Sequence, residues 1–297
     1  MPLAIIYISN KINQQGRLYW SLLLGLLLFS CGESPSTTTT SSSTARQLVQ
    51  SEFQSIMDQA QLAGSILIYD AQNDTYYSND FAWAQQGQLP ASTYKIPHTM
   101  IALETGVVES DRSVFTWDGQ PRAIKAWEQD LNLRDAFQVS CVPCYQEVAK
   151  KIGVQNMNHY LQAFNYGHIQ VDSSNLDHFW LVGGARISPF EQIDFLRRFY
   201  TRQLPISPRT DQLMRQIAWI ETTESYRISG KTGWSTDQNQ NNGWFVGFLE
   251  KEERVYYFAT NIKPSQTFDR QRFIQGRTTI TYQALNALGL IAGKELE

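Results

Sequence analysis

The order of local patterns along the chain predicts an α+β protein with a mostly antiparallel sheet. Apolar runs typical of strands occur early in the folded region and again in its last third. Between them, apolar residues recur at the spacing of helices. One sheet is therefore expected to be built from both chain ends, with flanking helices and an inserted helical subdomain, all within residues 46–297.

The first elements follow from short local patterns. Apolar residues at helical spacing predict a helix over residues 46–61. Strands are predicted over residues 65–70 and 75–77, because the Asn-Asp pair between them favours a turn. These two strands would form the N-terminal part of the sheet.

Three helices are predicted in the centre of the chain. The first spans residues 94–105 and stops at Gly106. The second spans residues 143–151, with a proline in its first turn and Gly153 just after it, and the third spans residues 189–203.

The last third of the chain returns to strand patterns. Strands are predicted over residues 226–230, 244–250 and 255–261, and a closing helix over about 278–290. The three strands are expected to join the N-terminal pair in one sheet.

Residues 1–31 are predicted to be a signal peptide that is not part of this fold. Residues 18–29 form an almost uninterrupted apolar run, and Lys11 and Arg17 precede it. A membrane span is the competing interpretation, but about 20 apolar residues are needed to cross a bilayer.

The apolar run ends at Leu28-Phe29-Ser30-Cys31, which resembles a bacterial lipobox with Cys31 as the lipidated residue. An ordinary cleaved signal with an incidental cysteine is the alternative. Residues 32–45 are rich in Ser and Thr and are expected to be a flexible tether. The sequence thus predicts an exported lipoprotein, periplasmic or on the outer face, that is held at the membrane only by its lipid.

The composition argues against some classes of partner. With 25 Lys and Arg against 28 Asp and Glu, the net charge of −3 gives no reason to expect nucleic acid or an anionic membrane surface. The hydrophobic fraction of 42% is ample for a core. The composition does not specify an oligomeric state.

Two cysteines, Cys141 and Cys144, have C-x-x-C spacing. A zinc site would need two further ligands, and the four histidines form no matching cluster in the sequence. A redox pair is possible in an oxidising compartment. The helix expected from Pro143 instead favours two free, packed thiols.

Ser92 and Lys95 form a candidate pair for nucleophilic catalysis. At a helix start, residues three apart share a face, so the Lys95 amine can lie against the Ser92 hydroxyl. That hydroxyl needs an adjacent base, and the apolar residues 96–103 indicate burial, which would lower the pKa of Lys95 and keep its amine neutral. Taken alone, Ser92 fits a helix cap and Lys95 a solvated lysine.

Two later tripeptides, Ser140-Cys141-Val142 and Lys231-Thr232-Gly233, support a site. Together with Ser92-x-x-Lys95 they make three motifs, whose order along the chain resembles that of the penicillin-recognising serine enzymes. The Ser-x-Val form is similar to that of the class D β-lactamases, the oxacillinases, and the resemblance extends from about residue 47 to 291. It includes four further motifs: Trp117-Asp118-Gly119, Trp127-Glu128-Gln129-Asp130, Trp180-Leu181-Val182-Gly183 and Gly243-Trp244-Phe245-Val246-Gly247. One departure is Tyr166-Gly167-His168, where the family has Tyr-Gly-Asn.

The resemblance implies roles for the residues around the nucleophile. It implies that Lys95 is carboxylated by carbon dioxide and that the resulting anion is the general base for both steps. It also implies that the Trp180 indole donates a hydrogen bond to that group and that Ser140 relays a proton to the departing nitrogen. Val142 is expected to line the same pocket.

Substrate binding is expected along the Lys-Thr-Gly strand. Lys231 and Thr232 lie at a predicted strand end, where an edge can pair with the substrate amide and the amine supplies positive charge. The backbone N–H groups of Ser92 and of Trp234, just after Gly233, are expected to form the oxyanion hole.

A guanidinium is the natural partner of a substrate carboxylate. The family's arginine precedes the last helix, a place that Arg277 occupies in this chain, with Arg270 and Arg272 as nearby alternatives.

The activity implied by the resemblance is hydrolysis of the β-lactam ring of penicillin-type small molecules through an acyl-serine intermediate. It requires no metal and no organic cofactor, only carbon dioxide or bicarbonate for the lysine. Two alternatives remain: a β-lactam sensor domain that acylates without turnover, and a transpeptidase acting on cell-wall peptide. A sensor is normally the end of a polytopic membrane protein, and a transpeptidase would not require Trp180 or the Ser-x-Val form.

Overall fold

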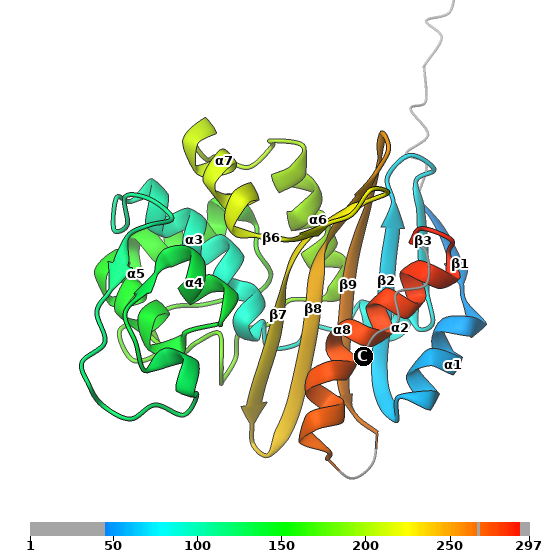
Figure 1. Ribbon diagram of the computed structural model, residues 1–297, viewed down its shortest axis with the longest axis horizontal. Coiled ribbons are helices and arrows are strands. Elements are labelled where there is room, and N and C mark those ends of the chain that lie inside the picture. The colour runs from blue at the N-terminus through cyan, green and yellow to red at the C-terminus, as the bar shows by residue number, and fades with distance from the viewer. Residues whose placement is uncertain (1–44, 266–267, 292–297) are drawn as a thin grey trace, which may run out of the picture. The chain divides into compact units, whose positions relative to one another are not determined.

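A seven-stranded sheet in the order β1-β3-β2-β9-β8-β7-β6 forms the centre of the fold (Figure 1). The computed structural model describes residues 45–265 and 268–291. Every strand pair in this sheet is antiparallel except β1 with β3. The strands are β1 (Arg46–Val49), β2 (Leu62–Asp70), β3 (Thr75–Ser78), β6 (Trp219–Thr222), β7 (Arg227–Asp237), β8 (Gln240–Lys251) and β9 (Arg254–Pro264). The predicted sheet from both chain ends is therefore confirmed.

Helices cover both faces of this sheet (Figure 1). On one face, α1 and α8 pack against each other and against the central strands. The remaining helices lie between β3 and β6 in the sequence and form the expected inserted subdomain, together with the short pair β4 (Val114–Phe115) and β5 (Leu131–Asn132). The helices are α1 (Ser51–Gln59), α2 (Phe81–Ala84), η1 (Ala91–Tyr94), α3 (Lys95–Glu104), η2 (Lys125–Trp127), α4 (Leu133–Gln138), α5 (Val142–Phe164), α6 (Pro189–Tyr200), α7 (Pro208–Ile217) and α8 (Arg270–Ala287).

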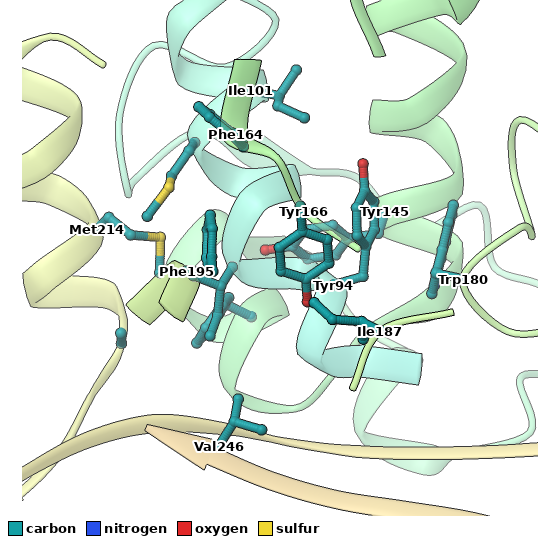
Figure 2. Packing of buried hydrophobic residues seen from close by; sticks show 14 of the residues in the cluster. Tyr94, Ile101, Tyr145, Phe164, Tyr166, Trp180, Ile187, Phe195, Met214 and Val246 are labelled. Carbon is teal, nitrogen blue, oxygen red and sulfur yellow. The ribbon is translucent and has the colours of Figure 1, made fainter. Parts of the chain in front are cut away.

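Two apolar cores result from the alternation of side chains along the central strands. Successive strand residues point to opposite faces, so Val246 packs with the helical subdomain whereas Phe245 packs with α1 and α8. Figure 2 shows Val246 below the aromatic cluster of the helical side. The sheet is thus held between two helical layers.

The predicted helix over residues 46–61 is wrong in its first turn. Residues 46–49 form β1, which pairs in parallel with β3, and Leu48 lies opposite Tyr77. The helix α1 begins only at Ser51. Pairing with a distant strand overrides the local periodicity here.

Several helical segments differ from the sequence-based prediction. Gly153, with φ 76° and ψ 164°, interrupts α5, so its first segment ends close to the predicted residue 151 and a second helical segment, which was not predicted, continues to Phe164. The prediction missed α4 and α7, and α8 begins at Arg270, eight residues earlier than expected, behind the cap residue Asp269.

The predicted signal peptide, Cys31 and nearly all of the tether lie outside the described residues. Across residues 45–265 and 268–291, no helix is long and apolar enough to span a bilayer.

Candidate active site

The turn from η1 into α3 brings Ser92 and Lys95 together. The Lys95 amine donates a hydrogen bond to Ser92 Oγ over 3.1 Å, as the spacing of three predicts. Ala91, just before the serine, has a positive φ of 51°, a backbone state that is costly for a non-glycine residue and clusters at functional sites. Its N–H donates to the Trp180 carbonyl over 2.8 Å, which fixes the turn.

Lys95 is completely buried. Burial first, and the nearby Lys231 second, hold the pKa of its amine well below the usual value. Its Nζ lies 4.8 Å from the centre of the Tyr145 ring. A neutral amine in contact with a hydroxyl can accept the hydroxyl proton, which activates the oxygen as a nucleophile.

Two buried polar side chains beside this pair have no hydrogen-bond partner in the described part of the chain. They are Trp180, through its indole N–H, and His98, through both ring nitrogens. The two rings lie 5.3 Å apart, and His98 also contacts Tyr145 at 5.1 Å between centres. Figure 2 shows Tyr94, Tyr145 and Trp180 in this cluster. An unpaired buried donor is unusual and fits an acceptor held next to Lys95.

Sequence analysis did not identify His98. It follows Lys95 by three residues and therefore shares its helix face, so the spacing alone could have indicated it. Burial lowers the pKa of His98 to about 3. The imidazole is therefore neutral near pH 7.

Ser140 and Lys231 form the second polar contact of the site. Ser140 lies between α4 and α5 with a positive φ of 56°, and its hydroxyl accepts a hydrogen bond from the Lys231 amine over 2.5 Å. Burial, followed by the charge of Arg277, lowers the pKa of Lys231 to about 7. This lysine can therefore gain and lose a proton near neutral pH.

The Lys-Thr-Gly motif lies in the middle of a strand, not at its end as predicted. Strand β7 continues to Asp237, but β6 pairs with it only over residues 227–229. From Lys231 onward, no other described strand pairs with this edge. The open edge can therefore receive an extended ligand.

Gly233 lets β7 approach the nucleophile closely. A Cβ at this position would lie 3.2 Å from the Thr93 side chain and 3.3 Å from the backbone nitrogen of Ser92. Any side chain here would require its neighbours to move. The absence of one keeps the backbone of Gly233 and Trp234 beside Ser92, as two oxyanion-hole donors require.

Arg277 reaches this edge from within α8. The prediction that it precedes the last helix is wrong, because α8 begins at Arg270. Its guanidinium donates to the Gly233 carbonyl over 3.1 Å. Burial lowers its pKa to about 10, so it remains a cation at pH 7. Of the two alternatives, Arg270 stacks on the Trp234 ring at 4.8 Å, and Arg272 is exposed beside a cavity on the α1 side of α8.

The expectation of two free thiols is wrong, because Cys141 and Cys144 form a disulfide. Their Cα atoms are 5.4 Å apart, which is within the range that a disulfide allows. Cys141 is the cap residue of α5, and Val142 is its first residue, half-buried. The disulfide therefore closes the first turn of the helix that follows Ser140.

His168, which stands where the family has Asn, makes none of the polar contacts described above. The His168 side chain is exposed, and its Nε2 lies 3.5 Å from Glu191. The preceding Tyr166 instead connects to the nucleophile turn: its hydroxyl donates to Gln192, and the Gln192 amide donates to Thr93 over 2.8 Å. This chain of contacts supports the turn from behind, and sequence analysis missed it.

Comparison with known proteins agrees with this geometry. A family model described as the penicillin-binding protein transpeptidase domain matches residues 36–282. Beta-lactamase OXA-10 of Pseudomonas aeruginosa is 38% identical over 77% of this chain and 86% of its own. The chain belongs to the class D β-lactamases. OXA-48 of Klebsiella pneumoniae is 43% identical over 67% of this chain and 75% of its own.

Solved structures of class D enzymes share the fold. The class D β-lactamase YbXI from Nostoc matches with a TM-score of 0.78 and 41% identity, over 82% of this chain and all of the other. Both the resemblance stated from the motifs and the α+β fold class are therefore confirmed.

Proposed function

We propose that this class D protein hydrolyses the β-lactam ring of penicillin-type antibiotics through an acyl intermediate on Ser92. The observation that carries the proposal is the 3.1 Å contact between Ser92 and the buried Lys95, whose pKa is held well below the usual value by burial. The similar proteins from Pseudomonas and Klebsiella bear the name β-lactamase.

Acylation follows from the two lysine–serine contacts. Lys95, in the carboxylated form proposed below, accepts the hydroxyl proton while Ser92 Oγ bonds to the ring carbonyl carbon. The backbone N–H groups of Ser92 and Trp234 stabilise the negative oxygen. As the ring C–N bond breaks, Ser140 gives a proton to the nitrogen, and Lys231, which donates to Ser140 over 2.5 Å, replaces it.

Deacylation requires a base that takes a proton from water as the water attacks the ester. We propose that Lys95 serves as the general base of both steps in a carboxylated form. A neutral buried amine can react with carbon dioxide, and the unpaired Trp180 indole N–H supplies a donor for the product. Carboxylation would give this position an anionic general base.

The substrate carboxylate is proposed to bind at Lys231, Thr232 and Arg277. The pKa of Arg277, at about 10, keeps it cationic at pH 7, and its contact with Gly233 places it at the open edge of β7. The substrate amide would pair with that edge, and Val142 would line the pocket from the start of α5.

Export as a lipoprotein is also a proposal. It rests on the apolar run over residues 18–29, on the lipobox-like Cys31 and on the Ser/Thr-rich residues 32–45. The mature protein would be periplasmic or on the outer face, attached through its lipid.

A sensor domain that acylates without turnover is the second candidate. No specific observation favours it, since the relatives that cover most of the chain are named as β-lactamases. A transpeptidase activity has only the broad family description in its support.

Steady-state turnover of a penicillin by the purified protein tests the function. Mass spectrometry after mixing with a slow penicillin should show a covalent adduct on the peptide that contains Ser92, and Ser92→Ala should lack both the adduct and turnover. A persistent adduct without turnover would indicate the sensor, and an adduct on another peptide would exclude the acyl-Ser92 mechanism.

A further inference from the structure

A cavity of about 400 Å³ adjoins the Lys-Thr-Gly motif at the end where β6 begins. Gly230, Lys231 and Thr232 form one side of it. We call this cavity the β6 pocket. The rest of its wall is mostly apolar and is formed by Phe137, Ile217, Trp219, Ile220, Phe245 and Tyr282, together with the polar residues Gln138 and Thr278. The pocket is therefore continuous with the proposed carboxylate site.

Two large apolar side chains of this wall are exposed to solvent. Trp219 is 40% and Ile220 39% exposed. The indole N–H of Trp219 donates to Thr222 Oγ1 over 3.0 Å, a contact within β6 that orients the ring. Adjacent exposed apolar residues at the rim of a cavity are typical of ligand-binding surfaces.

The order of contacts along β7 gives the direction of a bound β-lactam. Its carbonyl would lie near Ser92 and the backbone of Trp234, because Gly233 packs against the Ser92 nitrogen. Of the groups proposed to bind its carboxylate, Arg277 contacts Gly233, whereas Lys231 and Thr232 lie between Gly233 and Gly230 and give the direction. Continuing along β7 in the same direction leads to Gly230 and then into the β6 pocket.

In a cephalosporin, the carbon that bears the carboxylate is bonded to C3 of the six-membered ring. A substituent at C3 therefore continues in the direction that leads away from the carbonyl and past the carboxylate. In a penicillin, the carbon next to the one that bears the carboxylate carries only two methyl groups. Of the two substrate types, the cephalosporin can therefore place a larger group in this pocket.

We propose that the β6 pocket binds an apolar, aromatic substituent at C3 of cephalosporin-type β-lactams, with Trp219 and Ile220 as specificity-determining residues. This inference rests on the function proposed above. The volume is at the lower end of the roughly 300–1,000 Å³ of small-molecule sites, which suits a substituent rather than a whole antibiotic. None of the lining residues is acidic and Lys231 is basic, so a neutral substituent is preferred over a cationic one.

The test compares cephalosporins that share one acylamino side chain and differ only at C3. Methyl, neutral styryl and cationic pyridinium-vinyl groups are joined through carbon, so none is expelled when the ring opens. The unmodified protein should show a KM roughly tenfold lower for the styryl compound than for the methyl compound, by burial of an aromatic group. The KM of the cationic compound should be close to that of the methyl compound. The kcat values of the three compounds should differ little.

Variants of the lining residues test whether the KM difference arises in the β6 pocket. Trp219→Ala and Ile220→Ala should each reduce the KM difference between styryl and methyl compounds, and Trp219→Phe should retain most of it. Val49→Ala is the matched control, because Val49 is an exposed apolar residue, 71% accessible, on β1 at the opposite edge of the sheet. It should keep the full difference.

The outcomes separate the pocket from the underlying function. Equal KM values across the C3 series, with penicillin turnover intact, would overturn the pocket alone. A KM difference that survives both alanine variants would overturn the assignment to β6. Absence of turnover with every β-lactam would overturn the function on which the inference rests. If Trp219→Ala fails to fold, the KM values of the C3 series on the unmodified protein and on Trp219→Phe still test whether the pocket binds the C3 substituent.

Discussion

Lys95 and Lys231 are both buried, but their surroundings adapt them to different tasks. Lys95 contacts a hydroxyl and an aromatic ring, and burial holds its pKa well below the usual value. The pKa of Lys231 falls to about 7. Burial therefore disfavours the charged form of Lys95, whereas Lys231 changes charge near neutral pH.

This difference predicts how activity depends on pH. Lys231 loses its positive charge as the pH rises through about 7, so kcat/KM for a carboxylate substrate should decline on the alkaline side. Lys231→Arg should shift that decline to higher pH, because a guanidinium stays charged. The profile of kcat/KM between about pH 5 and 9 measures the groups of the free enzyme. An unchanged alkaline limb in Lys231→Arg would contradict the assignment to Lys231.

The unpaired indole of Trp180 gives a second prediction at this scale. Trp180→Phe should leave the melting temperature nearly unchanged, because its N–H has no partner among the described residues. It should slow deacylation by roughly tenfold or more, as loss of one hydrogen bond to a charged group implies, and make activity depend on added bicarbonate. ¹³C NMR with labelled bicarbonate should show a carbamate signal that is weakened in the variant.

Trp244→Phe is the matched control for this experiment. It also removes a buried indole N–H, but one that donates to the Leu89 carbonyl over 2.8 Å. It should lower stability by roughly 1 kcal/mol without a new dependence on bicarbonate. If both variants depended equally on bicarbonate, the dependence would result from a less stable fold and not from loss of the Trp180 hydrogen bond.

At the scale of elements, the site depends on where helices begin. Ser92 and Lys95 lie at the junction of η1 and α3, Ser140 lies just before α5, and Arg277 lies in the second turn of α8. Gly106 ends α3 as expected, whereas the early start of α8 depends on its cap residue Asp269 and was missed.

Other parts of the site depend on non-local contacts, which sequence alone does not contain. The contact of Ser92 with Lys95 follows from spacing in one turn, and it was predicted. The unpaired state of Trp180 and His98 depends on which side chains surround them in three dimensions. The strand formed by residues 46–49 likewise exists because β3 pairs with it.

The disulfide at the start of α5 provides a prediction for this element. Reduction of Cys141–Cys144 should lower the free energy of unfolding by about 2 kcal/mol, the amount expected for a short loop. It should also lower kcat, since the first turn of α5 follows Ser140 directly. Cys144→Ser should show both effects without reductant. Thermal melts and rates measured with and without reductant check this, and continued sensitivity of Cys144→Ser to reductant would contradict it.

At the scale of the whole molecule, the site combines residues from the sheet and from the helices on both of its faces. Ser92, Lys95 and Ser140 come from the inserted helical subdomain, Lys231 comes from the sheet, and Arg277 comes from the helix on the opposite face. No single layer contains the complete set. Packing of the helical subdomain on the sheet therefore positions nucleophile and substrate-binding groups relative to each other.

The compartment of the protein and the chemistry of its site are connected through Cys141–Cys144. A disulfide beside the active site persists in an oxidising compartment, which export would provide. If Cys31 anchors the mature chain, full-length protein should incorporate labelled fatty acid and partition with membranes, since two or more acyl chains give stable attachment. Cys31→Ser should abolish both, whereas Cys144→Ser should retain both. Unlipidated protein cleaved at another residue and recovered in the soluble fraction would show that Cys31 is incidental to an ordinary signal peptide.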